Sequence, residues 1–325
     1  MKKKIPDFEE AIRVIKIDEE NYMGAYPLRL PMIGARGVYG GHTVAQTLLV
    51  AIESAPEDFV PHSFHAYFVK AGSGKTPMHY KVLKLHDDER FAKRSIQVIQ
   101  EGKVRFNCIA SLVKSNNSSS FEIQPPIPKA QIKYPDMDKL TVVHHTDYIR
   151  NAYSPEFEDF RLVPEENSQE PADRWIVVFS GLDQPSPFKN PSSHYVGMAD
   201  LTDSAFLTTM ARVLHLPWNP TENGPVESFD EEKDARKLME RSLNILHLFH
   251  YNAMSLDHHI YFHDNDHANF DMTKDWLCFA YQMRRLSNSR TLVRGHLFNK
   301  EGKCVATVVQ EGLTYLFEGI TDARL

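Results

Sequence analysis

The sequence predicts an α+β fold built from two similar units, each with one helix followed by an antiparallel sheet. One helix-like segment and four strand-like segments occur in the same order twice along the 325 residues. Glu-Gly-Lys stands before the last strand-like segment of each unit, at 101–103 and 301–303, and Arg94 and Arg294 share this spacing. Such self-similarity indicates a duplicated unit. Two such sheets can join edge to edge into one continuous sheet, which removes exposed strand edges.

The first unit is predicted to span residues 1–114. Apolar residues recur at helical spacing within 40–52, and Pro56 follows as a helix stop. Runs rich in β-branched and aromatic residues then predict strands. They lie at 62–69, 78–85, 91–100 and 104–113.

Residues 115–194 differ in character, because Ser, Asn and Pro are frequent there. We expect a long connecting region that contains some ordered pieces, such as the apolar run at 174–180.

The second unit is predicted to span residues 195–325. A helix is expected over 199–214, and strands are expected at 254–263, 276–286, 290–299 and 303–317. The last two strands should form a hairpin around Glu301-Gly302-Lys303.

Composition excludes several classes of protein. The formal net charge is −6, which argues against a general nucleic-acid binder, since such proteins need a basic face. No apolar run approaches the ~20 residues of a membrane span, and we identify no secretory signal. Cys108, Cys278 and Cys304 lie in apolar runs, which is typical of reduced core thiols.

The stretch 71–77, AGSGKTP, resembles a phosphate-binding loop only superficially. The first glycine of that motif would be residue 69, which is Val69, and Pro77 and a strand follow where a helix is needed. We therefore expect a hairpin loop.

Histidines cluster at His258, His259, His263 and His267. On a strand, His259 and His263 share a face that excludes His258, so structural hydrogen bonding is favoured over a metal site. No G-x-S-x-G nucleophile motif occurs.

Two polar residues lie on predicted apolar faces. Asp203 falls on the stripe of its helix, where a carboxylate is costly unless it is paired or functional. The alternative is a helix cap, a role that suits Asp200 better. Gln310 interrupts the buried face of the last strand and needs partners, which a structural hydrogen bond would also provide. The residue 200 positions before Gln310 is Ala110, so any site belongs to the second unit.

These residues lie in motifs that resemble the acyl-CoA thioesterase II family, whose members are double hotdogs. The motifs are "GGHTVAQ" at 40–46, "HSFHAYF" at 62–68, "TDSAFL" at 202–207, "SLDHHIYFH" at 255–263 and "QEG" at 310–312. The sequence departs from the family where Thr202 replaces a common Ser, His42 replaces a Gln, and Ser255 stands where bacterial members often have Thr.

The resemblance implies hydrolysis of fatty acyl-CoA by direct attack of water, with Asp203, Ser255 and Gln310 holding that water. Backbone N–H groups near a helix start would polarise the thioester carbonyl. No cofactor or metal is implied. Two rival interpretations are a hotdog enoyl-CoA hydratase, in which Asp257 and His258 would form the catalytic pair, and a non-catalytic acyl-CoA-binding protein.

The resemblance also implies a homodimer or larger assembly. The final residues Ala323-Arg324-Leu325 resemble a peroxisomal import address of the S-K-L type. We therefore expect an import receptor as a partner and a peroxisomal location in a eukaryotic source, and a cytoplasmic one otherwise.

Overall fold

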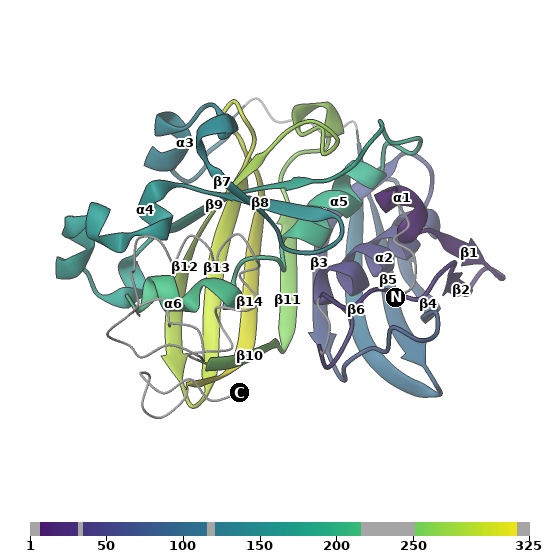
Figure 1. The fold of residues 1–325 in the computed structure, drawn as a ribbon. Helices are drawn as coiled ribbons and strands as arrows, with labels where there is room; N and C mark the ends of the chain where they lie inside the picture. The colour runs from purple at the N-terminus through teal and green to yellow at the C-terminus, as the bar shows by residue number, and fades with distance from the viewer. Residues whose placement is uncertain (1–6, 32–34, 116–120, 216–250, 317–325) are drawn as a thin grey trace.

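The computed structural model describes residues 7–31, 35–115, 121–215 and 251–316 (Figure 1). Its helices are α1 Phe8–Ala11, α2 Gly40–Glu53, α3 Lys129–Lys133, α4 Pro155–Glu158, α5 Ser193–Leu201 and α6 Met210–Val213. Its strands are β1 Val14–Lys16, β2 Asn21–Gly24, β3 Phe59–Phe68, β4 His79–Asp87, β5 Phe91–Gln100, β6 Lys103–Lys114, β7 Thr141–His144, β8 Ile149–Tyr153, β9 Ile176–Leu182, β10 Tyr251–Ser255, β11 Asp257–Phe262, β12 Leu277–Ser287, β13 Arg290–Phe298 and β14 Cys304–Leu316.

The strands form one 14-stranded sheet, which confirms the predicted duplication and the edge-to-edge junction. The order is β1-β2-β4-β5-β6-β3-β11-β14-β13-β12-β9-β8-β7, and β10 also pairs with β14. The order β4-β5-β6-β3 in the first unit therefore corresponds to β12-β13-β14-β11 in the second. The antiparallel strands β3 and β11 meet at the centre, where Ser63 faces Tyr261 and Tyr67 faces Asp257. In Figure 1, α2 and α5 lie together over the middle of this sheet, and they contact each other.

Strands other than those predicted for the two units extend the continuous sheet at both ends. β2 precedes α2 in the chain and pairs with β4, while β9 precedes α5 and pairs with β12. β8 and β7 continue the sheet beyond β9. The predicted ordered run at 174–180 thus overlaps β9, and residues 141–182 contribute strands to the second half of the sheet.

Both Glu-Gly-Lys segments form the hairpins that the sequence predicts. Glu101 and Gly102 join β5 to β6 with φ values of 52° and 70°, the backbone of a two-residue turn that suits the sheet twist. Gly302 lies in the loop between β13 and β14 with φ 82°. Arg94 and Arg294 are not equivalent, however, because Arg94 is buried in the core and Arg294 is exposed.

The expected hairpin at residues 71–77 is wrong. This segment joins β3 to β4, which are separated in the sheet by β5 and β6, so it is a crossover. The side chain of Gln100 holds it, accepting from Ser73 N–H at 2.7 Å and donating to the carbonyls of Ser73 and Thr76 at 2.8 and 2.7 Å. Lys75 is exposed on the loop.

The three cysteines are buried and free, as predicted. Among the described residues, no helix has the length and apolar character that crossing a membrane requires.

Candidate active site

The helix predicted over 199–214 is interrupted where Asp203 lies. Helix α5 ends at Leu201, and a turn follows in which Ser204 N–H donates to the carbonyl of Leu201 at 3.0 Å. The Thr202 hydroxyl lies 2.7 Å from the carbonyl of Ala199, a local bond that competes with helix continuation. Asp203 is therefore in a turn, where its carboxylate can leave the helix surface.

The proposed capping role of Asp200 is also wrong. Asp200 lies in the last turn of α5 and is fully buried, with its Oδ1 2.7 Å from His42 Nδ1. Its backbone carbonyl accepts from the Tyr39 hydroxyl at 2.9 Å. Asp200 thus fastens the end of α5 to the beginning of α2.

All three predicted site residues come together in one hydrogen-bonded group. Ser255 Oγ donates to Asp203 Oδ1 at 3.0 Å. Gln310 Nε2 donates to the same carboxylate oxygen at 3.0 Å and to Ser255 Oγ at 2.7 Å. Gln310 is 1% exposed, whereas Asp203 and Ser255 are partly exposed. The turn after α5, the end of β10 and the middle of β14 therefore present a carboxylate and a hydroxyl that solvent can reach.

The surroundings of Asp203 bring its ionisation close to neutral pH. Burial raises the pKa of this carboxyl to about 6, and the negative charge of Asp200 acts in the same direction. Hydrogen bonds from Ser255, Gln310 and the Gly41 N–H oppose that rise, because they favour the ionised form. A carboxylate with such a pKa is suited to accept a proton from water at physiological pH.

The first unit supplies one wall of this site. A Cβ atom at Gly40 would collide with Asp203 Oδ2, and a Cβ at Gly41 would collide with the backbone carbonyl of Asp200. Only glycine lets the start of α2 approach the turn after α5 so closely. Gly40 and Gly41 are the sequence signal for this approach. The reason why glycine is needed there becomes visible only in the fold.

His258 makes structural hydrogen bonds of the kind that the sequence favours for the histidine cluster. This side chain is fully buried, with Nδ1 2.7 Å from Gln310 Oε1 and Nε2 2.7 Å from Thr202 Oγ1. His259 points to the other face of the sheet, where its Nδ1 lies 3.2 Å from that of His65. The described residues contain no group of three or more side chains arranged to hold a metal ion.

The geometry does not assemble the Asp257–His258 pair of the hydratase interpretation. Adjacent residues of a strand project to opposite faces, and here only His258 points toward Asp203 and Gln310. The Asp257 carboxylate instead accepts from the Glu311 N–H at 2.7 Å.

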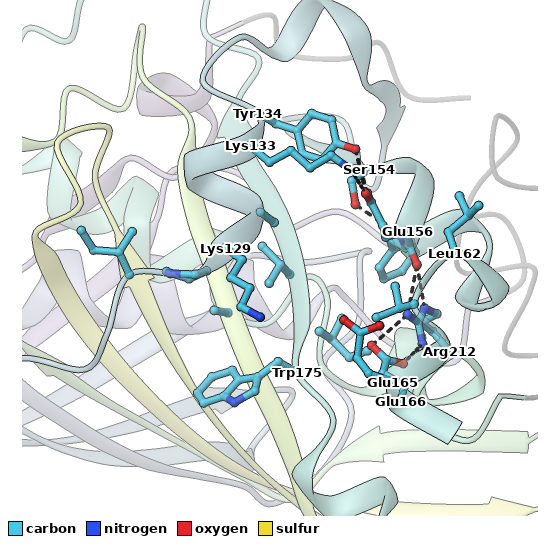
Figure 2. A pocket seen from close by; sticks show the side chains of 18 of the residues that line it. Lys129, Lys133, Tyr134, Ser154, Glu156, Leu162, Glu165, Glu166, Trp175 and Arg212 are labelled. Atoms are coloured by element: carbon cyan, nitrogen blue, oxygen red, sulfur yellow. Dashed lines mark hydrogen bonds and ion pairs between the residues drawn. The ribbon is translucent and has the colours of Figure 1, made fainter. Parts of the chain in front are cut away.

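A cavity of about 610 Å³ is lined by residues of β9, β12 and β13 and of the segment 126–169 (Figure 2). Its apolar floor includes Val177, Ala280 and Phe298, and its charged groups are largely engaged with one another. Lys133 and Tyr134 contact Glu156, while Arg212 Nη1 lies 2.7 Å from Glu166 Oε2. None of the three predicted site residues lines this cavity, so it offers no comparable group for hydrolysis.

Comparison with known proteins shows the family of this chain. Residues 26–113 match the acyl-CoA thioesterase N-terminal domain, and residues 128–314 match the acyl-CoA thioesterase C-terminal domain. The chain belongs to the acyl-CoA thioesterase family. Members of this family are enzymes that hydrolyse acyl-CoA thioesters, and the rival interpretations are not favoured.

Two relatives illustrate the extent of the match. Human acyl-coenzyme A thioesterase 8 is 25% identical over 95% of this chain and 89% of its own length. Peroxisomal acyl-coenzyme A thioester hydrolase 1 of Saccharomyces cerevisiae is 24% identical over 94% of this chain and 93% of its own length.

Solved structures show the same fold. An acyl-CoA thioesterase II from Mycobacterium marinum superposes with a TM-score of 0.64 at 21% identity, covering 96% of this chain and 98% of that one. A hot dog fold protein from Alicyclobacillus acidocaldarius superposes with a TM-score of 0.61. The predicted tandem hotdog is thus confirmed.

Proposed function

We propose that this acyl-CoA thioesterase hydrolyses its substrate with a water held by Asp203, Ser255 and Gln310. The observation that carries the assignment is the shared oxygen Asp203 Oδ1, to which both Ser255 and Gln310 donate. Asp203 accepts a proton from the water while the water oxygen bonds to the thioester carbonyl carbon. The carbon–sulfur bond then breaks, and the thiolate of CoA leaves and takes up the proton that Asp203 had accepted. The products are a fatty acid and free CoA.

The carbonyl oxygen would be stabilised by N–H groups at the start of α2. This helix has 14 residues, and the side chain of its N-cap residue, Tyr39, does not cap it. Its first N–H groups lack partners within the helix and carry the positive end of the helix dipole. Since Asp203 rests against this end, the same region can attract both the carboxylate and the developing oxyanion. The first unit then contributes backbone donors, and the second contributes the side chains that hold the water.

The test is the activity of Asp203→Ala across a series of acyl-CoA chain lengths. Thiol release, measured with a thiol reagent, is expected to fall by about 10²- to 10⁴-fold in kcat while the variant stays folded. Normal turnover by this variant would remove Asp203 from the site. A change in enoyl absorbance without thiol release would instead indicate a hydratase, and saturable binding without turnover would indicate a binding protein.

We also propose that the protein is peroxisomal when its source is eukaryotic, because the yeast relative is named as a peroxisomal enzyme. The tripeptide Ala323-Arg324-Leu325 lies outside the described residues and stays a prediction. A fluorescent protein fused to the N-terminus should enter peroxisomes and should stay in the cytosol when these residues are deleted. Diffuse fluorescence from the intact fusion would contradict the proposal.

Assembly into a homodimer or larger, and the division into 1–114, 115–194 and 195–325, also remain proposals. The two family matches, over residues 26–113 and 128–314, support a boundary near residue 114. Sedimentation of the purified chain would measure the assembly directly.

A further inference from the structure

We propose that His258 is a positioning residue that determines which end of the Gln310 amide faces Asp203. The inference deepens the proposed function and rests on it, since it concerns the same site. His258 lies behind Gln310 and touches neither Asp203 nor Ser255 by any hydrogen bond among the described residues. It acts through the amide.

The amide of Gln310 is useful to the site in one orientation only. With Nε2 toward Asp203, its two N–H groups are both used, one by the carboxylate and one by Ser255 Oγ. Rotating the amide by half a turn would place Oε1 about 3 Å from the carboxylate oxygen, where two acceptors repel. Ser255 Oγ would then have no donor from Gln310.

His258 favours the useful orientation from the other side. Its Nδ1 is 2.7 Å from Gln310 Oε1, so an N–H at Nδ1 donates to the amide oxygen. Its Nε2 then lies 2.7 Å from the Thr202 hydroxyl, whose proton is shared between this nitrogen and the carbonyl of Ala199. A chain of hydrogen bonds runs from Thr202 through His258 and Gln310 to Asp203. Its two ends are neighbours in the sequence. The chain therefore fixes both the amide and the turn that carries Asp203.

Burial keeps this imidazole neutral. Burial lowers the pKa of His258 to about 4, and His259 acts in the same direction. Asp257 on the same strand opposes it, as does the Gln310 hydrogen bond. The Asp203 carboxylate lies at the other side of the Gln310 amide, and the charge of Asp200 acts on Asp203. A neutral ring has one N–H, so the ionised Asp203 selects the tautomer with that N–H at Nδ1.

The experiment compares His258→Ala, His258→Asn and His258→Gln. The Asn amide can place a donor near the position of Nδ1, whereas Gln reaches toward Nε2. His258→Ala and His258→Gln should lower kcat about 10-fold or more with a smaller change in KM. They should also raise the acid-limb pKa of kcat by roughly one unit, because Asp203 loses part of its donor set. His258→Asn should keep kcat and the acid-limb pKa close to the values of the unmodified protein. His259→Ala, altered at the adjacent residue on the opposite face, is the matched control and should resemble the unmodified protein.

A second readout is independent of activity. The ¹³C signal of the Asp203 carboxyl, assigned by its absence in Asp203→Asn, reports its pKa directly and should rise in His258→Ala. The inference is overturned if kcat, the acid limb and the carboxyl titration in His258→Ala all match His259→Ala, or if Asn rescues no better than Gln. Full activity in Asp203→Asn would overturn the proposed function, and the carboxyl titration would still decide whether His258 acts on Asp203.

Discussion

Equivalent positions of the two units carry opposite chemistry. Pro61 faces Leu112 in the first unit as Ser255 faces Gly312 in the second. Phe64 faces Ala110, and the pairing of His259 with Val309 places His258 opposite Gln310. The trio of the first unit is Pro61, Phe64 and Ala110, and the trio of the second unit is Ser255, His258 and Gln310.

The helices differ in a complementary way. α2 runs unbroken over 14 residues and has no acidic residue in its first turn. α5 spans 9 residues and gives way to the turn that presents Asp203. The first unit thus keeps the intact helix and apolar side chains at these three positions, while the second has a buried polar network there. The comparison teaches that polar groups are tolerated at these positions because each finds a partner.

The largest expected effect is on stability and concerns Arg94. In the first unit Arg94 is opposite Ala110, and in the second Val293 is opposite Gln310, so Val293 is its counterpart. The guanidinium of Arg94 is buried, pairs with Asp87 and donates to the carbonyl of Ser54 at 2.8 Å. Arg94→Ala should lower the free energy of unfolding by about 3 kcal/mol, measured by urea denaturation. Arg294→Ala, at an exposed position, should stay within about 0.5 kcal/mol. Equal losses would refute the assignment of counterparts.

The second expected effect comes from making the second unit resemble the first. Gln310→Ala copies Ala110, removes both donors to the site and leaves His258 without its acceptor. We expect kcat/KM to fall roughly 100-fold, measured by thiol release. Gln124→Ala, distant from the site, is a control at another glutamine. Activity equal to that control would mean that the amide has only a packing role.

The third effect is the pH dependence of stability. The pKa of Asp203 is raised to about 6 in the folded protein, from about 4 when unfolded. Between these values the folded state binds more protons, so this group contributes stability at low pH that is lost as the pH rises through 6. We therefore compare the free energy of unfolding of Asp203→Asn with that of the unmodified protein. This difference should shift in favour of the variant by roughly 2 kcal/mol between pH 4 and pH 8, after allowance for the partial exposure of Asp203. Urea midpoints at both pH values measure this shift. An unchanged difference would show that the carboxyl pKa is not raised.

The fourth effect is the mildest and tests the contribution of the first unit. Gly40→Ala would press a methyl group against Asp203 Oδ2. We expect the carboxylate to shift and kcat to fall about 10-fold, with far-UV circular dichroism unchanged. Ala45→Gly, further along α2, alters the same helix away from the site and should retain activity. If Gly40→Ala also retained it, the start of α2 would not constrain Asp203.

Much of this architecture was predictable, because its signals are local. The two hairpins follow from Glu-Gly at the turns, and the buried amide of Gln310 stands out within an apolar alternation. The structure places Asp203 beside Ser255 and Gln310, but in a turn and not within the helix that the sequence predicts. Its apolar spacing suggested a continuous helix, but the Thr202 hydroxyl bonds to Ala199 and the backbone turns at Ser204. The hairpin expected at 71–77 failed because strand pairing is decided by distant segments.

The sequence by itself determined the duplication, the positions of most strands and the three polar residues of the candidate site, because periodicity and turn chemistry act over short stretches. Only the tertiary structure decided that Gly40 lies against Asp203, that His42 reaches Asp200 across 158 positions, and that His258 stands behind Gln310. These contacts arise where α2 and α5 pack over the junction of β3 and β11. Their physical reason is the close approach of two helix ends, which no local pattern specifies.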